Sequence, residues 1–124
     1  MPDRFPTELL ALLRQTREIR IETVSEGGTA HSTIIWVVVD DKGRALIRSY
    51  RGPTARWYRE ALARSSVTLQ LGTRRIPATA QVATDDDRIE AASRGFLEKH
   101  AGDSATPAMV ADGVLSTTLE LIPR

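Results

Sequence analysis

Arginine side chains are concentrated in one part of the chain. Residues 44–75 contain eight arginines and one acidic residue, which gives this segment a formal charge of +7, whereas all 124 residues together carry +1. Arginine presents a planar fork of N–H donors that matches phosphate and carboxylate groups. The clustering predicts a site for an anion. The alternative is a solvated basic face. Nearly all basic residues of this chain are arginines, and only two are lysines.

The most specific candidate site surrounds a Gly-Pro pair at residues 52–53. A strand is expected to end just before this pair and a helix to begin just after it. Glycine allows a ligand to approach the backbone closely, and a helix N-terminus carries partial positive charge. Two hydroxyl residues on an adjacent strand, Ser32 and Thr33 of the segment 31–39, are placed to add hydrogen bonds. We predict that this region binds the phosphate of a cofactor through Ser32, Thr33, Arg48, Ser49, Arg51, Gly52 and Arg56.

The helix that follows this turn carries Trp57 and Tyr58. A tryptophan on an amphipathic helix usually anchors the helix to a sheet. We therefore assign Trp57, Tyr58 and Leu62 to packing and the arginines to binding.

The elements that must position these residues can be read from hydrophobic periodicity and turn signals. Helices are expected over residues 6–16, 54–64 and 85–100, and residues 104–113 form a loop or one short helical turn. Six strands are expected over residues 18–24, 31–39, 45–50, 67–71, 76–83 and 115–122. The second strand is apolar on both faces, which is typical of a central strand. Short hairpin turns favour a small barrel over an open sheet. The prediction is an α+β fold in one domain, residues 1–124, with a mostly antiparallel six-stranded barrel and about three flanking helices.

Composition excludes several other classes of protein. The chain has no cysteine and two isolated histidines, which argues against disulfides, thiolate chemistry and a zinc site. It has no apolar run long enough to span a membrane and no signal-peptide pattern, so we expect a cytoplasmic protein. No nucleophile elbow, phosphate-binding loop or zinc-protease motif is present. If the protein is an enzyme, a cofactor must carry the chemistry.

The segment Arg48–Ala63, RSYRGPTARWYREALA, resembles the split β-barrel flavin-binding superfamily. That superfamily includes pyridoxamine phosphate oxidase-like proteins and deazaflavin-dependent nitroreductases. The order of parts is most similar to the nitroreductase branch, in an uncharacterised bacterial subfamily, and extends over about residues 18–83. Two features depart from that branch: Ala55-Arg56 stands where Asn-Pro often precedes the tryptophan, and the C-terminal region lacks tyrosines that some nitroreductases place over the substrate.

The resemblance implies a homodimer that binds FMN or a deazaflavin coenzyme, with the rings at the dimer interface and the phosphate near the arginines. The function it implies is an oxidoreductase that transfers hydride to a small acceptor. The alternative is a non-enzymatic module that binds or sequesters a phosphate-bearing cofactor or another anionic small molecule. Nucleic-acid binding is the weakest hypothesis, because the net charge is near zero and few aromatic residues accompany the arginines.

Overall fold

The computed structural model describes residues 3–124 and consists of seven strands, five α-helices and one 3₁₀ turn. The strands are β1 (Ile19–Val24), β2 (Ala30–Ile35), β3 (Val37–Val39), β4 (Ala45–Ile47), β5 (Ser66–Leu71), β6 (Arg74–Val82) and β7 (Leu119–Pro123). The helical elements are α1 (Thr7–Gln15), η1 (Gly52–Thr54), α2 (Arg56–Arg64), α3 (Asp86–Lys99), α4 (Thr106–Met109) and α5 (Asp112–Leu115).

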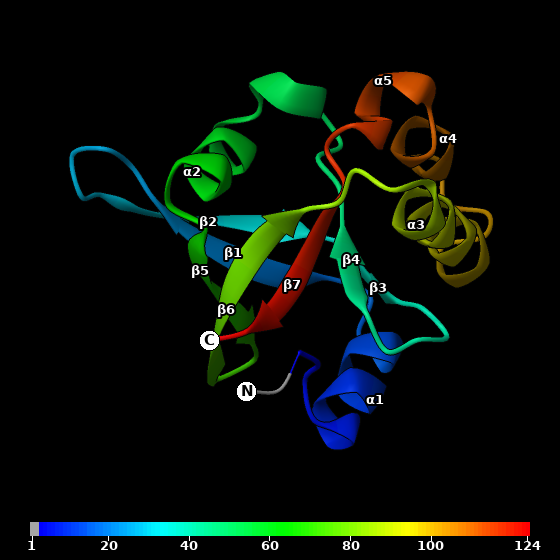
Figure 1. The fold of residues 1–124 in the computed structure, drawn as a ribbon, viewed down its shortest axis with the longest axis horizontal. Coiled ribbons are helices and arrows are strands. Elements are labelled where there is room, and N and C mark those ends of the chain that lie inside the picture. Colours follow the sequence, from blue (N-terminus) through cyan, green and yellow to red (C-terminus); the bar gives the residue numbers. More distant parts are fainter. Residues whose placement is uncertain (1–2) are drawn as a thin grey trace.

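The strands form one curled antiparallel sheet in the order β2-β1-β5-β6-β7-β4-β3 (Figure 1). Strands β2 and β3 occupy opposite ends of this order, yet only Trp36 separates them in the chain. The sheet must therefore curl until its two edges meet near Trp36. The α+β class and the antiparallel pairing are confirmed.

The predicted strand count of six is wrong, because the strand expected over residues 31–39 divides at Trp36. Its first half pairs with β1 and its second half with β4, which lie at different places in the sheet. Its expected central position is also wrong, since both halves are edge strands. Of the apolar residues that suggested a central strand, Val38 is buried against helix α3 instead, whereas Ile34 is exposed.

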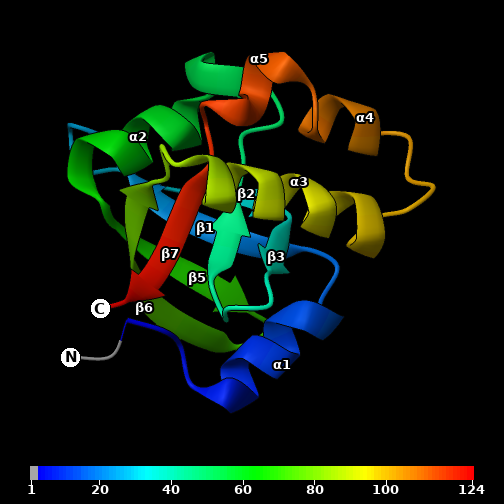
Figure 2. The same cartoon turned by 45° about the vertical axis from the view of Figure 1, so that its right-hand side comes forward.

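The main hydrophobic core lies inside the curled sheet. Alternate residues of β1 and β5 point into it, including Ile19, Ile21 and Leu69. Helices α1 and α2 lie at opposite ends of the sheet (Figure 2) and contribute apolar side chains to this core. From α2 these are Trp57, Tyr58 and Ala61. Trp57 is therefore a packing residue, as predicted, whereas Leu62 is 44% exposed and does not anchor the helix.

A second, smaller core lies between the outer face of β3–β4 and helix α3. Val38 and Leu46 point out of the barrel and pack against Ala92 and Phe96. Gly95 makes this close approach possible: a Cβ atom on it would lie 2.8 Å from Cβ of Val38. This contact explains why β3 and β4 are apolar on both faces although β3 is an edge strand.

The C-terminal region differs from the expectation in two ways. Residues 104–113 contain helix α4 and the start of α5, so residues 3–124 form five α-helices rather than about three. The last strand begins at Leu119 rather than at residue 115. The hydroxyls of Thr117 and Thr118 donate to the carbonyls of Val114 and Leu115, at 2.6 and 2.7 Å. Such local bonds favour a turn over a strand.

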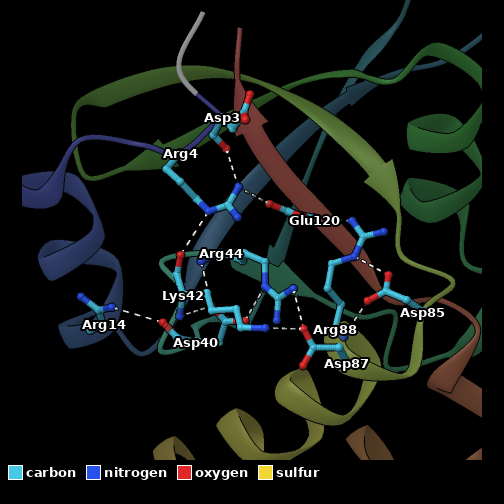
Figure 3. Close-up of polar contacts among 10 residues, drawn as sticks. All are labelled: Asp3, Arg4, Arg14, Asp40, Lys42, Arg44, Asp85, Asp87, Arg88 and Glu120. Carbon is cyan, nitrogen blue, oxygen red and sulfur yellow. Dashed lines mark hydrogen bonds and ion pairs between the residues drawn. The ribbon is translucent and has the colours of Figure 1, made fainter.

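An ion-pair network joins the N-terminal segment, the β3–β4 turn, the start of α3 and strand β7 (Figure 3). Glu120 accepts from Arg4 at 3.4 Å and from Arg88 at 2.9 Å. Asp87 lies 3.0 Å from Arg44, which also pairs with Asp40 at 2.6 Å. The network ties together segments that are far apart in sequence, and it accounts for Arg44, one of the clustered arginines, as a structural residue.

Candidate functional site

Four arginines converge on one groove, which we call the arginine groove, with a volume of about 780 Å³. They come from three places in the fold: Arg20 from β1, Arg51 from the turn after β4, and two from helix α2. The full lining consists of Arg20, Ser32, Thr33, Ile34, Tyr50, Arg51, Thr54, Ala55, Arg56, Trp57 and Arg59. No acidic residue belongs to this lining.

Three of these arginines have no partner within the described part of the chain. Among residues 3–124, no hydrogen bond or ion pair involves the side chains of Arg20, Arg51 and Arg59. Arg56 differs, because its guanidinium lies 3.4 Å from the Thr33 hydroxyl and 3.9 Å from the Glu60 carboxylate. The groove thus concentrates positive charge that no ion pair among the described residues neutralises.

Glu60 lies beside the groove and is held in its charged form. Burial alone would raise its pKa, but hydrogen bonds from Thr23 and His31 and the charge of Arg56 outweigh burial and lower the pKa of Glu60. The Thr23 hydroxyl donates to Glu60 Oε1 at 2.7 Å, and His31 Nδ1 lies 3.2 Å from Oε2. The carboxylate thereby fixes helix α2 against the β1–β2 hairpin and sets the position of Arg56.

An apolar pocket of about 340 Å³ adjoins the arginine groove. The two share Ile34, Tyr50 and Trp57, so one ligand can occupy both. Ile34 and Tyr50, which border both spaces, are 51% and 55% exposed. The complete lining is Glu18, Ile34, Ile35, Trp36, Arg48, Tyr50, Trp57, Asp103, Ala105 and Met109.

The structure places Arg48 differently from the other predicted binding residues. It is 1% exposed, and its guanidinium donates to Thr118 Oγ1, Ser93 Oγ and the carbonyls of Met109 and Ile89, at 2.6–3.1 Å. Burial lowers the pKa of Arg48 to about 10. It borders the apolar pocket, but most of its N–H donors are engaged by the protein. Its position indicates a structural cation that holds α3 and the C-terminal region to β4.

Ser49 and Gly52 form the turn beneath Arg51. The Ser49 hydroxyl donates to the Gly52 carbonyl at 2.6 Å, and Gly52 N–H donates to the Ser49 carbonyl at 3.0 Å. Gly52 has φ +79°, a conformation that side chains disfavour. Both residues are buried and do not line the arginine groove. They shape the turn that carries Arg51.

The predicted set therefore divides. The structure brings Ser32, Thr33, Arg51 and Arg56 together in the arginine groove, and it places Arg48, Ser49 and Gly52 behind the surface. Sequence reasoning missed Arg20 and Arg59. Signals for both exist in the chain: Arg59 follows Arg56 by one helical turn, and Arg20 pairs with Ile34 across the first hairpin.

Trp36 forms part of the apolar pocket and is supported from behind by His100. The two rings are stacked with centroids 3.7 Å apart and planes 2° apart. His100 is 1% exposed, and neither ring nitrogen has a hydrogen-bond partner among the described residues. Burial, together with the charges of Lys99 and Arg17, lowers the pKa of His100. A neutral imidazole thus holds the indole in place.

Two further features of the described residues bear on function. Within residues 3–124, no three side chains of the metal-ligating acidic, histidine or cysteine type converge on one point. None of the helices in the same range has the length and hydropathy needed to cross a bilayer.

Comparisons with known proteins identify the family and the fold. The family described as "Uncharacterized protein conserved in bacteria (DUF2255)" matches residues 9–121. No curated protein matches the chain in sequence.

Three solved structures share the fold. Conserved hypothetical protein Rv2991 from Mycobacterium tuberculosis aligns with a TM-score of 0.70 and 16% identity, over 98% of this chain and 81% of that one. The heme storage protein HutZ from Vibrio cholerae aligns with a TM-score of 0.66 and 13% identity, over 98% of this chain and 91% of that one. A Listeria innocua protein described as "Putative Pyridoxamine 5′-phosphate oxidase" aligns with a TM-score of 0.67 and 16% identity, over 94% of this chain and 91% of that one. The fold is that of pyridoxamine phosphate oxidase-like split-barrel proteins.

Proposed function

The chain belongs to the bacterial family DUF2255, and we propose that it binds a planar cofactor that carries an anionic group. The rings would occupy the apolar pocket and the anionic group the arginine groove. One observation carries this proposal: a groove with three unpartnered arginines is continuous with an apolar pocket through Ile34, Tyr50 and Trp57. Ligand sites commonly combine an apolar slot with a few polar groups that fix orientation.

Flavins fit this arrangement. A flavin phosphate needs cations and N–H donors, which Arg20, Arg51 and Arg59 supply, and its rings need a flat apolar surface, which the two tryptophans border. The fold shared with the Listeria protein supports a flavin or deazaflavin phosphate as the first ligand to test.

Heme is the second ligand to test, because HutZ shares the fold and is described as a heme storage protein. The carboxylates of a heme would pair with the same arginines. Tyr50 and Met109 border the apolar pocket, and a phenol and a thioether are both known ligands of heme iron. No histidine belongs to the lining of this pocket.

The decisive experiment is a titration of the purified protein with FMN, deazaflavin coenzyme and heme, followed by absorbance and by fluorescence of the two tryptophans. At least one ligand is expected to bind saturably and to quench the fluorescence. The variant Arg51→Gln/Arg59→Gln should weaken that binding at least tenfold, because each charged hydrogen bond contributes about 1.5–3 kcal/mol. Arg74→Gln, which removes an exposed arginine outside the groove, is the matched control.

Saturable binding of none of the three ligands would overturn the proposal. So would binding that the double variant leaves unchanged. Saturable binding alone would be enough for a protein that stores or carries the ligand, without any catalysed reaction.

An oxidoreductase is a second candidate function, supported by the fold shared with the Listeria protein. A bound flavin would supply the hydride chemistry, and the protein would position it. If FMN binds, the reduced complex should pass electrons to an acceptor dye faster than free reduced FMN does. Equal rates would leave binding as the function.

The proposal extends to assembly as a homodimer, as the family resemblance implies. A second copy would cover the exposed side chains of Ile34 and Tyr50 beside the site. Light scattering after gel filtration tests this, and a monomer at micromolar concentration would contradict it.

A further inference from the structure

We propose that the ligand of the arginine groove carries at least two anionic groups, as in a diphosphate, rather than a single phosphate. The inference rests on the proposed function, because it specifies the ligand of the same site. Its evidence is the charge, the donor count and the shape of the groove.

The charge of the groove exceeds what one phosphate neutralises. Glu60 compensates Arg56, which leaves Arg20, Arg51 and Arg59 without a counter-charge among residues 3–124. A phosphate monoester carries about −1.5 to −2 near pH 7. One such group would leave about one guanidinium unbalanced, and a second phosphate attached to it would supply the missing charge.

The donors also outnumber the acceptors of a single phosphate. Each guanidinium offers five N–H donors, and a terminal phosphate offers three oxygens. None of the three arginines spends a donor on another described residue. A chain of two phosphates, or a phosphate followed by a carboxylate, presents additional acceptors at a second position.

The arrangement of the groove favours an extended anion. The three arginines come from three separate elements: β1, the turn after β4, and helix α2. Arg20 is held by pairing of β1 on both sides, opposite Ile34 and Gln70. The groove, at about 780 Å³, has more than twice the volume of the apolar pocket at about 340 Å³. The charged part of the ligand therefore has the larger space.

General arginine richness does not account for this pattern. Within residues 3–124, the only other arginines without a hydrogen bond or ion pair are Arg74 on β6 and Arg94 on α3. Both are exposed, and neither borders the groove or the apolar pocket. Three of five unpartnered arginines thus meet at one place, and the other two provide matched controls.

Calorimetric titration of the full chain with inorganic phosphate, pyrophosphate and tripolyphosphate at constant ionic strength tests the inference. Pyrophosphate is expected to bind at least tenfold more tightly than phosphate. Arg51→Gln and Arg59→Gln should each lower pyrophosphate affinity about tenfold, the loss of roughly one charged hydrogen bond. Arg74→Gln and Arg94→Gln should leave it unchanged.

Equal affinities for phosphate and pyrophosphate would overturn the inference, as would equal losses in the control variants. Tighter binding of single-stranded oligothymidylate than of tripolyphosphate would also overturn it, because the groove would then be a nucleic-acid surface.

The two proposals fail separately. If FMN binds but pyrophosphate is no better than phosphate, the cofactor site stands and the diphosphate assignment falls. If pyrophosphate binds preferentially but no planar ligand does, the groove assignment stands and the planar cofactor falls.

Discussion

The imidazole of His100 lies flat against the indole of Trp36, with ring centroids 3.7 Å apart. The histidine is fully enclosed, and the indole borders the apolar pocket. The stack thereby packs the C-terminal end of α3 directly against one wall of the candidate site. It also makes that wall sensitive to protonation.

Stability is expected to fall as the pH is lowered below about 6.5. Burial and nearby cations depress the pKa of His100 in the folded protein, so the unfolded chain takes up a proton first. The stabilisation is complete above the unfolded value of 6.5 and is lost progressively as the pH falls toward the folded value. Urea unfolding between pH 7.5 and 5.5 measures this slope. His100→Phe keeps an aromatic ring stacked on Trp36 but removes the titrating group, so the dependence of stability on pH should become flatter. An unchanged slope in that variant would show that His100 does not cause the pH dependence.

Replacement of Arg48 is expected to damage folding rather than ligand binding alone. Arg48→Met leaves the buried hydroxyls and carbonyls that the guanidinium contacts without that donor. Leaving several such acceptors unpaired should cost about 3 kcal/mol of unfolding free energy. Arg51→Met, on the surface of the same turn, should change stability by no more than about 0.5 kcal/mol. Urea denaturation of both variants makes the comparison, and similar small losses in the two would show that Arg48 is not a structural cation.

Gly95→Ala is expected to destabilise the protein although alanine favours helices. The new Cβ would lie 2.8 Å from Cβ and 2.9 Å from Cγ2 of Val38. Overpacking typically costs about 1–3 kcal/mol, against a gain in helix propensity of about 1 kcal/mol. A net loss of about 1 kcal/mol should appear in thermal or urea unfolding.

A double-mutant cycle isolates this contact. In a Val38→Gly background the Cβ and both Cγ atoms of this contact are absent, so Gly95→Ala should become neutral or stabilising. The same loss in both backgrounds would place the strain elsewhere.

Glu120→Gln should weaken the ion-pair network. The Glu120 side chain is only 6% exposed, and its carboxylate accepts hydrogen bonds from both Arg4 and Arg88. Removing its charge should cost about 2 kcal/mol, in the range of a buried charged hydrogen bond. Asp87→Asn, at a carboxylate that is 54% exposed, should have a smaller effect because solvent already screens it. Melting temperatures at low and high salt make the comparison, and the reverse order of effects would contradict it.

Local sequence patterns determined most of the secondary structure. The amphipathic helices α1, α2 and α3 and the hairpin β5–β6 lie close to their predicted ranges, because periodicity and turn residues act over a few positions. The predictions are wrong where contacts with segments distant in sequence decide the local structure. Trp36 divides a continuous apolar run because the two halves pair with different strands, and Thr117 and Thr118 replace the start of a strand with a turn.

The sequence by itself determined that an arginine cluster surrounds the turn at residues 51–52 and that aromatic residues on the following helix hold it in place. Only the tertiary structure decided which arginines face a ligand. Arg48 and Arg51 look equivalent in sequence, yet the first is buried among hydroxyls and carbonyls and the second is exposed in the groove. Arg20 reaches that groove only because β1 pairs with β2. Charge is a property of composition, but its availability depends on which partners the fold brings within hydrogen-bond distance.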